Sequence, residues 1–358
     1  MARHAPAPAS GWRTMALVTA ALAAVVAGLF WVAGCGGTAT SRAARASAHP
    51  SATATATATA ASAPRGLYTD PANALYNSVT LLRETGRQDQ AAVLNRVAST
   101  PSGIWASGQA GEFQDVRNAA RAATRKNEIP VIVAYNLPDR DACGKLSAVP
   151  SATGPAYEQW INQLAAAIGA ADAIVVVEPD GLPDIVRRCL SPGQATERYQ
   201  LLQYAMRTLG SLPEARVYLD AGNPGMFSDP APLAGPLQQA GVRYGRGISA
   251  NVSNFQWTDY VVGWSQQLER DLGGHVSAVV DTSRNGNGPY TGPQSPQWCN
   301  PPGRATGPAP TLDPHAVGID AYLWIKNPWA SDGPCHGGPP AGQVWVQYTL
   351  SLAQAAKS

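Results

Sequence analysis

The chain has 358 residues, of which 26 are basic and 24 are acidic, and its formal net charge at pH 7 is +2. Five of the arginines lie before residue 66, where there is no acidic residue, so residues 66–358 are mildly acidic. A mildly acidic segment without basic clusters argues against nucleic acid or an anionic polymer as a partner. The same residues suffice for one large α/β domain with a substantial core.

The N-terminal segment has the pattern of an export signal. Residues 1–14 contain two arginines and no acid, and an apolar stretch follows at residues 15–33. This pattern predicts a signal peptide. The stretch ends in VAGC, which resembles a bacterial lipobox, in which the cysteine, here Cys35, is lipidated and becomes the new N-terminus. A plain secretory signal and an uncleaved anchor are the alternatives, because the apolar stretch approaches the roughly 20 residues that span a bilayer.

We favour a lipoprotein, because Cys35 has no other evident partner in the sequence. Residues 1–35 are then the signal peptide, and the protein is held on the outer face of the cell membrane. Residues 36–65 consist almost wholly of Ala, Ser, Thr, Gly and Arg. Because this tract lacks large apolar side chains that would offset its ordering entropy, it predicts a disordered linker. Such a linker suits a polymeric or external substrate.

Residues 66–358 alternate between strand patterns and helix patterns. Apolar runs predict strands at residues 103–106, 131–135, 174–177, 217–219, 247–252, 276–280 and 317–323. Amphipathic stretches such as residues 157–168 and 195–209 predict helices between most of them. Repeated βα units indicate a parallel sheet, and about seven of them indicate a barrel.

The segment IVVVEPDGLP, residues 174–183, is the centre of the predicted domain. Its β-branched run predicts a strand buried on both faces, so Glu178 and Asp180 lie at the carboxyl end, where α/β proteins bind ligands. Pro179 fixes the backbone beside Asp180, and Gly181 is expected to allow a sharp turn. Helix capping by the two acids is the alternative interpretation.

Three further acids follow other predicted strands or lie in a loop, namely Asp141, Asp220 and Asp332. Together with Asp180 they can converge on one cleft, where repulsion and burial raise the pKa of one carboxyl and leave another ionised. Glycoside hydrolysis by a separate acid and base requires this division. The domain is also rich in Trp and Tyr, which suit sugar-binding surfaces but also serve as half-buried core residues.

Other chemistries have less support in the sequence. Asp139 and Asp229 are expected to be caps or surface charges, and there is no GxSxG elbow or glycine-rich phosphate loop. A zinc site is disfavoured, because there is no CxxC and the five histidines are scattered.

Four cysteines remain besides Cys35, and in an exported protein they predict two disulfides. Sequence alone allows three connectivities, of which proximity along the chain favours Cys143 with Cys189 and Cys299 with Cys335.

Seven segments occur in the order of a known family: VIVAYNLPDRDACG, VVVEPDGLP, YLDAG, RGISANVSNF, DTSRNGNGPY, QWCNPPGRA and DAYLWIK. They resemble glycoside hydrolase family 6, the inverting cellulases, over nearly all of residues 66–358. The resemblance implies a distorted, partly open α/β barrel of about seven parallel strands. It also supports the two disulfide pairings given above.

The resemblance assigns roles to the four acids. Asp180 matches the general acid that protonates the glycosidic oxygen. Asp141 matches the acid that keeps this proton on Asp180 and helps to relay a proton from water. Asp332 matches the candidate base, and Asp220 matches a fourth cleft acid that supports binding and electrostatics.

The resemblance also assigns substrate-binding residues. Tyr135 matches a tyrosine that crowds the distorted sugar ring, and Ser147 lies where a serine helps to position the water. Trp105, Trp298 and Lys326 fall where family members contact glucose units.

The chain departs from the family pattern at several of these segments. Ala142 separates Asp141 from Cys143, which are usually adjacent. Asn223 and Met226 replace the usual His and Trp, so one sugar platform is expected to be missing. Trp329 and Ala330 replace Gly and Glu, which removes a carboxylate that would bind a sugar hydroxyl.

The sequence thus predicts a monomeric, exported endo-β-1,4-glucanase that acts on a β-1,4-glucan and needs no cofactor or metal. The endo mode is expected because residues 66–358 leave little room for the long loops that roof the tunnel of cellobiohydrolases. The alternatives are a non-catalytic glucan-binding lipoprotein and an exo-acting or other β-glucan hydrolase on the same fold.

Overall fold

The structure is a computed structural model that describes residues 65–147 and 153–356. These residues belong to one compact unit that spans residues 61–358. The predicted signal peptide, the lipobox at Cys35 and nearly all of the predicted linker lie outside the described residues. In the part that the structure describes, no helix combines the length and the apolar character that a membrane crossing needs.

One parallel sheet forms the centre of this unit. Its seven strands, in spatial order, are β2 (Ile104–Ala106), β4 (Val131–Ala134), β5 (Ala173–Val177), β6 (Ala215–Asp220), β7 (Gly247–Ala250), β8 (Ser277–Asp281) and β9 (Ile319–Leu323). Every neighbouring pair is parallel, and a separate small sheet pairs β1 (Gly66–Leu67) with β3 (Glu128–Ile129). The predicted partly open, seven-stranded barrel is therefore confirmed, because β2 and β9 are edges that form no ladder with each other.

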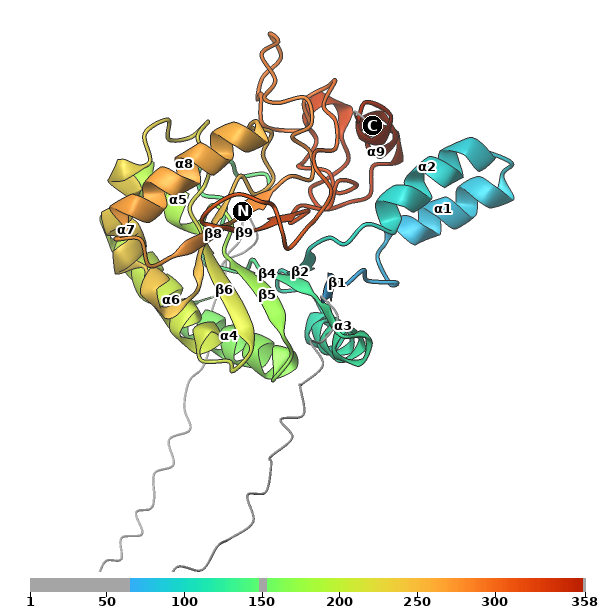
Figure 1. The fold of residues 1–358 in the computed structure, drawn as a ribbon. Coiled ribbons are helices and arrows are strands. Elements are labelled where there is room, and N and C mark those ends of the chain that lie inside the picture. Colours follow the sequence, from blue (N-terminus) through green and yellow to red (C-terminus); the bar gives the residue numbers. More distant parts are fainter. Residues whose placement is uncertain (1–64, 148–152, 357–358) are drawn as a thin grey trace, which may run out of the picture. The chain divides into compact units, whose positions relative to one another are not determined.

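The helices of the described residues are α1 (Leu75–Glu84), α2 (Gln88–Ala98), α3 (Glu112–Lys126), α4 (Gly154–Ile168), α5 (Gly181–Val186), α6 (Pro192–Gly210), α7 (Ala234–Gln239), α8 (Thr258–Asp271) and α9 (Val346–Gln354). Of these, α3 to α8 pack against the outside of the sheet, whereas the hairpin of α1 and α2 projects away from it (Figure 1). Short 3-10 turns lie at Ala231–Leu233, Val242–Tyr244 and Cys335–Gly337. The hairpin of α1 and α2 packs with α9 and buries Trp324 and Trp329 in a separate apolar cluster.

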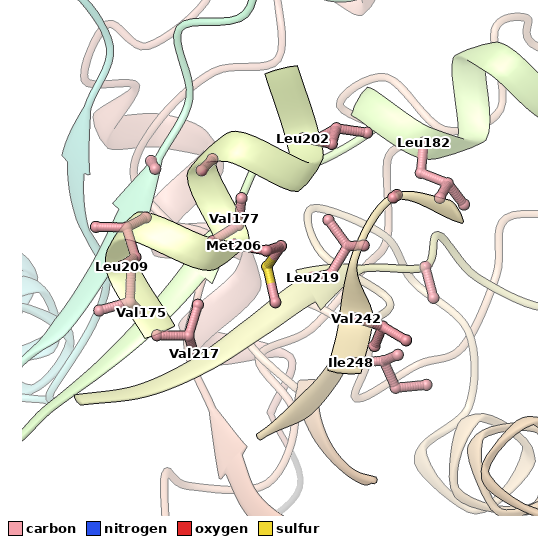
Figure 2. Packing of buried hydrophobic residues seen from close by; sticks show 14 of the residues in the cluster. Val175, Val177, Leu182, Leu202, Met206, Leu209, Val217, Leu219, Val242 and Ile248 are labelled. Atoms are coloured by element: carbon pink, nitrogen blue, oxygen red, sulfur yellow. The ribbon is translucent and has the colours of Figure 1, made fainter. Parts of the chain in front are cut away.

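Strand β5 is fully buried on both faces, as its β-branched sequence predicted. Val175 and Val177 pack outward against the helices, whereas Ile174 and Val176 belong to the cluster inside the curled sheet. Figure 2 shows the outer contact, in which α6 lays Leu202, Met206 and Leu209 over β5 and β6. This i, i+4, i+7 spacing puts all three side chains on one helix face.

The strand ends differ from the sequence prediction by a few residues, for local backbone reasons. Strand β7 ends at Ala250 and not at residue 252, because Asn251 adopts a left-handed conformation with φ of 66°. Strand β9 begins only at Ile319, because Gly318 has φ of 77° and Val317 is 88% exposed in the turn before it.

We predict that Leu202→Ala lowers the free energy of unfolding by about 2 to 5 kcal/mol, because it leaves a cavity between α6 and the sheet. Leu202 has no exposed surface. Urea denaturation followed by circular dichroism would measure the change. Leu81→Ala is the matched control, since Leu81 is 55% exposed and its truncation should change stability by less than about 0.5 kcal/mol. Equal losses in the two variants would contradict this account of the core.

Candidate active site

A cleft of about 420 Å³ opens at the carboxyl ends of the strands. Its walls come from Trp105 of β2 and from the loops that follow β4, β5, β6, β7, β8 and β9. Almost all of the predicted site residues line it, namely Trp105, Tyr135, Asp141, Ser147, Asp180, Trp298, Lys326 and Asp332. The exception is Asp220, which is 1% exposed and lies behind the wall.

The segment after β5 forms a rigid corner. Glu178 and Asp180 both adopt left-handed conformations, with φ of 53° and 66°, on either side of Pro179. The Glu178 carboxylate is fully buried and accepts hydrogen bonds from the backbone N–H groups of Asn136 and Leu137 at 3.1 and 3.2 Å. Burial raises the pKa of Glu178 to about 7. The corner is thereby tied to the end of β4.

The expected roles of two residues in this corner are corrected. Gly181 does not make the turn, since the positive φ values fall on its neighbours; instead, an added Cβ at Gly181 would lie 2.8 Å from the Leu137 side chain. Asp180 occupies the N-cap position of α5, as the alternative interpretation predicted, but its side chain makes no capping hydrogen bond. The Asp180 carboxyl is therefore available to the cleft.

Asp180 has the electrostatic surroundings of a protonated acid. Burial raises its pKa well above the usual range, and the charges of Asp220, Asp184 and Asp141 raise it further. A carboxyl that keeps its proton near neutral pH can donate that proton to a bound group.

Asp220 supports Asp180 from behind. Its Oδ2 atom accepts hydrogen bonds from the backbone N–H groups of Asp180 and Gly222, both at 3.1 Å, and the Ser249 hydroxyl donates to its Oδ1 atom at 3.2 Å. Burial raises the pKa of Asp220 to about 7. Asp220 therefore fixes the backbone of the acid from the protein side.

Asp141 faces the cleft from the loop after β4. Its Oδ2 atom accepts hydrogen bonds from the backbone N–H groups of Leu146 and Ser147, both at 2.7 Å. A side chain at position 144 would displace the Asp141 carboxylate, because an added Cβ at Gly144 would lie 2.2 Å from Asp141 Oδ1 and 3.3 Å from the Trp298 ring. The loop from Asp141 to Ser147 thus folds back so that its own backbone amides bind the Asp141 carboxylate.

Both predicted disulfides are present, and each holds a loop of the cleft. Cys143 is bonded to Cys189 and Cys299 to Cys335, with Cα atoms 5.3 and 6.2 Å apart. The first joins the Asp141 loop to the segment that follows α5, and Asp184 in α5 accepts a hydrogen bond from the Ala142 N–H at 2.7 Å.

Among the described residues, a geometric grouping that could hold a metal ion consists of Cys143, Asp184 and Cys189. Two of its three members are joined in a disulfide and have no thiolate to offer. The grouping therefore does not suit a metal.

Asp332 has surroundings opposite to those of Asp180. Arg284 Nη1 lies 2.8 Å from its Oδ2, Lys326 Nζ lies 3.1 Å from its Oδ1, and the Asn300 N–H donates to Oδ2 at 3.0 Å. Burial alone would raise the pKa of Asp332, but the two cations outweigh it and hold the pKa below its usual range. The pKa is therefore lowered at Asp332 and raised at Asp180, although burial acts in the same direction on both carboxyls.

The partners of Asp332 were not predicted from the sequence. Arg284 is fully buried and also donates to the Ser253 carbonyl at 2.6 Å. Another buried acid, Asp281, holds the same region by accepting hydrogen bonds from the N–H groups of Ser253 and Lys326. The sequence does indicate that Asp281 and Arg284 lie near the cleft, because the segment DTSRNGNG that contains them directly follows the predicted strand at residues 276–280.

Aromatic side chains form part of the cleft wall. The Trp105 and Tyr135 rings meet edge to face at 5.4 Å, and the Trp105 indole N–H donates to the Ile325 carbonyl at 2.9 Å. Trp298 is 41% exposed on the cleft. Burial raises the pKa of the Tyr135 hydroxyl well above its usual range, so this group remains a hydrogen-bond donor.

The departures from the family pattern have visible structural effects. Asn223 and Met226 line the cleft, and Asn223 Oδ1 is engaged by the N–H groups of Gly225 and Met226. Trp329 and Ala330 are 4% and 8% exposed and pack in the cluster of α1, α2 and α9. Ala330, which stands where the family usually has a glutamate, thus directly follows Trp329, a residue of this apolar cluster.

Together, a curled parallel sheet, an open cleft at its carboxyl edge, and one carboxyl with a raised pKa beside another with a lowered pKa are the features expected of hydrolases that use a separate acid and base, as glycoside hydrolases do. Comparison with known proteins specifies the family. Residues 62–356 match the family Glycosyl hydrolases family 6, and the chain belongs to that family. It is therefore a glycoside hydrolase.

Relatives and solved structures agree with this assignment. The chain is 38% identical to "Endoglucanase 1" of Streptomyces sp. (strain KSM-9), over 73% of this chain and 71% of that protein. It is 37% identical to "Endoglucanase A" of Cellulomonas fimi, over 82% of this chain and 62% of that protein. A solved endoglucanase Cel6 from Mycobacterium tuberculosis, in complex with a methyl-cellobiosyl-4-deoxy-4-thio-β-D-cellobioside, has a TM-score of 0.74 and 38% identity. The match covers 82% of this chain and 98% of that one.

We predict that Asp332→Asn lowers the free energy of unfolding at pH 7 by roughly 3 to 5 kcal/mol, because it leaves Arg284 buried with its charge uncompensated. The pKa of Asp332 is lower in the folded chain than the usual value of about 3.9 in the unfolded chain. Its stabilising effect is thus fully present above pH 4 and is lost as the pH falls through the folded value. The difference between wild type and variant should narrow below about pH 4, which urea denaturation at pH 7 and pH 3 would measure.

Asp229→Asn is the control for this prediction. Asp229 is exposed and caps its own turn through the Ala231 N–H, a hydrogen bond that asparagine can also accept. Its substitution should change stability by less than about 0.5 kcal/mol at either pH. A loss in Asp332→Asn that stayed the same at pH 7 and pH 3 would mean that the charge of Asp332 is not what stabilises the site.

Proposed function

We propose that this chain is an exported endo-β-1,4-glucanase that hydrolyses β-1,4-glucosidic bonds with inversion. The observation that carries the proposal is the pair of opposed carboxyls in one cleft, Asp180 with a raised pKa and Asp332 with a lowered one. The endoglucanase names of the relatives and the thio-cello-oligosaccharide in the Mycobacterium tuberculosis enzyme support the substrate class.

In the proposed mechanism, Asp180 donates its proton to the glycosidic oxygen as the bond from that oxygen to the anomeric carbon breaks. A water molecule attacks the anomeric carbon from the opposite face of the sugar and releases a proton to neighbouring water. Inversion requires acid and base carboxyls separated by roughly 6.5 to 9.5 Å, which leaves room for this water. The rigid corner after β5 and the backbone contacts of Asp220 keep the acid in place for the transfer.

The base function is divided in this proposal. Asp332 stays ionised and favours the positive charge that develops on the sugar ring. Its two cationic partners also make it a weak proton acceptor, since they stabilise the carboxylate over the acid. The proton of the attacking water therefore passes through solvent with help from Asp141, whose negative charge also keeps the proton on Asp180.

The aromatic wall binds the sugar chain. Trp105 and Trp298 present ring faces to glucose units, and Tyr135 crowds the ring at the bond that is cleaved. Lys326 contacts sugar hydroxyls, and Ser147 helps to position the attacking water. Because Asn223, Met226 and Ala330 replace the usual side chains, we infer altered affinity at the neighbouring subsites.

The function is tested by reducing-sugar release from carboxymethylcellulose and mixed-linkage β-glucan. The parent should be active, and Asp180→Asn should lose on the order of 10² to 10⁴ in rate, because an amide cannot protonate the leaving oxygen. Asp229→Asn, the same substitution on an exposed aspartate, should keep full activity. Proton NMR of the same reactions should show the α-anomer of the product first.

Other outcomes would change the assignment. A β-anomer formed first would exclude inversion. An inactive parent that still binds glucan would favour the non-catalytic glucan-binding lipoprotein. Full activity in Asp180→Asn would remove Asp180 from the role of general acid.

We further propose that residues 1–35 direct export, that Cys35 carries a lipid, and that residues 36–65 link it to the catalytic domain. The sequence VAGC and the preceding apolar stretch support this proposal. Mass spectrometry of the mature protein should find an N-terminal peptide that begins at a diacylated Cys35. A free serine or alanine N-terminus within residues 36–65 would exclude lipid attachment.

A further inference from the structure

The cleft is shorter than any glucan polymer, so a long chain bound in it must leave across the surrounding surface. One wall of the cleft is the loop between β7 and α8, in which Val252 to Gln256 line the cleft. The next residue, Trp257, is 49% exposed at the start of α8, and Tyr260, one turn further on, is also 49% exposed. Residues three apart on a helix lie on the same side. Trp257 therefore lies on the rim of the cleft, directly after a segment that lines it, and Tyr260 lies on the same side of α8 one turn further on.

Trp257 is held on this rim by the opposite loop. Its ring packs directly on Gly288, where an added Cβ would lie 2.1 Å from the indole. The residues after Gly288, Pro289 and Tyr290, line the cleft. Trp257 is thus bordered by cleft residues along its own loop and across from it, and the exposed surface is continuous with the cleft.

Hydrogen bonds make this arrangement rigid. The Asn285 side chain donates to the Gln256 carbonyl at 2.9 Å and to the Thr258 hydroxyl at 3.0 Å, which ties the two loops together. By contrast, neither the Trp257 indole N–H nor the Tyr260 hydroxyl has a hydrogen-bond partner among the described residues. Their polar edges are free to bond to a ligand.

We propose that Trp257 and Tyr260 form an auxiliary binding platform for the part of a β-glucan chain that extends beyond the cleft. The proposal rests on the proposed function. An apolar ring face with a free polar edge suits a pyranose, whose C–H groups lie over the ring while its hydroxyls bond at the edge. Because the Trp257 ring is packed on Gly288 before binding, little ordering entropy opposes its contact with the sugar. The platform acts on long chains and leaves short oligosaccharides unaffected.

The test compares Trp257→Ala, Tyr260→Ala and the double variant with wild type on two substrates. On a long soluble β-glucan the double variant should raise KM roughly 5- to 10-fold, as expected from the loss of two ring contacts. On a short cello-oligosaccharide that fits inside the cleft, kcat/KM should stay unchanged. Leu81→Ala, which truncates another exposed apolar residue on α1, should affect neither substrate.

The single variants and the two substrates separate a loss of binding from a loss of structure. Trp257→Ala could disturb the Gly288 loop, so Tyr260→Ala, whose side chain lies on the helix surface, must by itself raise KM on the long substrate. Equal losses on long and short substrates, or no loss on either, would overturn the platform. If wild type hydrolysed neither substrate, the proposed function would fail, and the platform would then be tested by binding alone. In that case less of the double variant than of wild type should sediment with insoluble β-glucan, and equal sedimentation would overturn the platform.

Discussion

The buried contact between Glu178 and the end of β4 is the interaction on which the site depends. A carboxylate removed from water is costly unless it is hydrogen-bonded, and Glu178 is bonded by two backbone amides and the Tyr157 hydroxyl. These bonds offset the positive φ values of Glu178 and Asp180, which are unfavourable for residues other than glycine. Unfavourable backbone conformations and a buried acidic group thus both occur in the segment from Glu178 to Asp180, which places the Asp180 carboxyl at the cleft.

The cost of burying a charge also acts on Asp180 and Asp332, but the groups that surround them shift their pKa values in opposite directions. Asp180 faces other acids and has no cation close enough to overcome them, whereas Asp332 is held between Arg284 and Lys326. Burial disfavours the charged form at both positions, so the partners decide the outcome. One cleft can therefore hold a proton donor and a permanent negative charge at the same pH.

The strands and the convergence of the acids could be predicted from sequence, because both follow from simple rules. β-branched runs such as Ile174 to Val177 are buried, and parallel strands end at one edge, so the acids that follow them meet. The turn chemistry could not be predicted in this way. The left-handed residues at the corner are Glu178 and Asp180, although glycine at 181 was the stronger local signal. The partners of Asp332 were also missed, since Arg284 is 48 residues away in sequence and loop conformation decides that pairing.

The open edge of the sheet bears on how the protein holds together. Strands β2 and β9 do not form a ladder, and the Gly103 N–H donates across the gap to the Trp324 carbonyl at 2.9 Å. Trp105 belongs to one side of this seam and Lys326 follows the other, with the ammonium 6.0 Å from the indole ring. The Trp105 indole N–H also donates across the seam to the Ile325 carbonyl at 2.9 Å. Side chains at the carboxyl end of the sheet thus join two edge strands that the backbone ladder leaves apart.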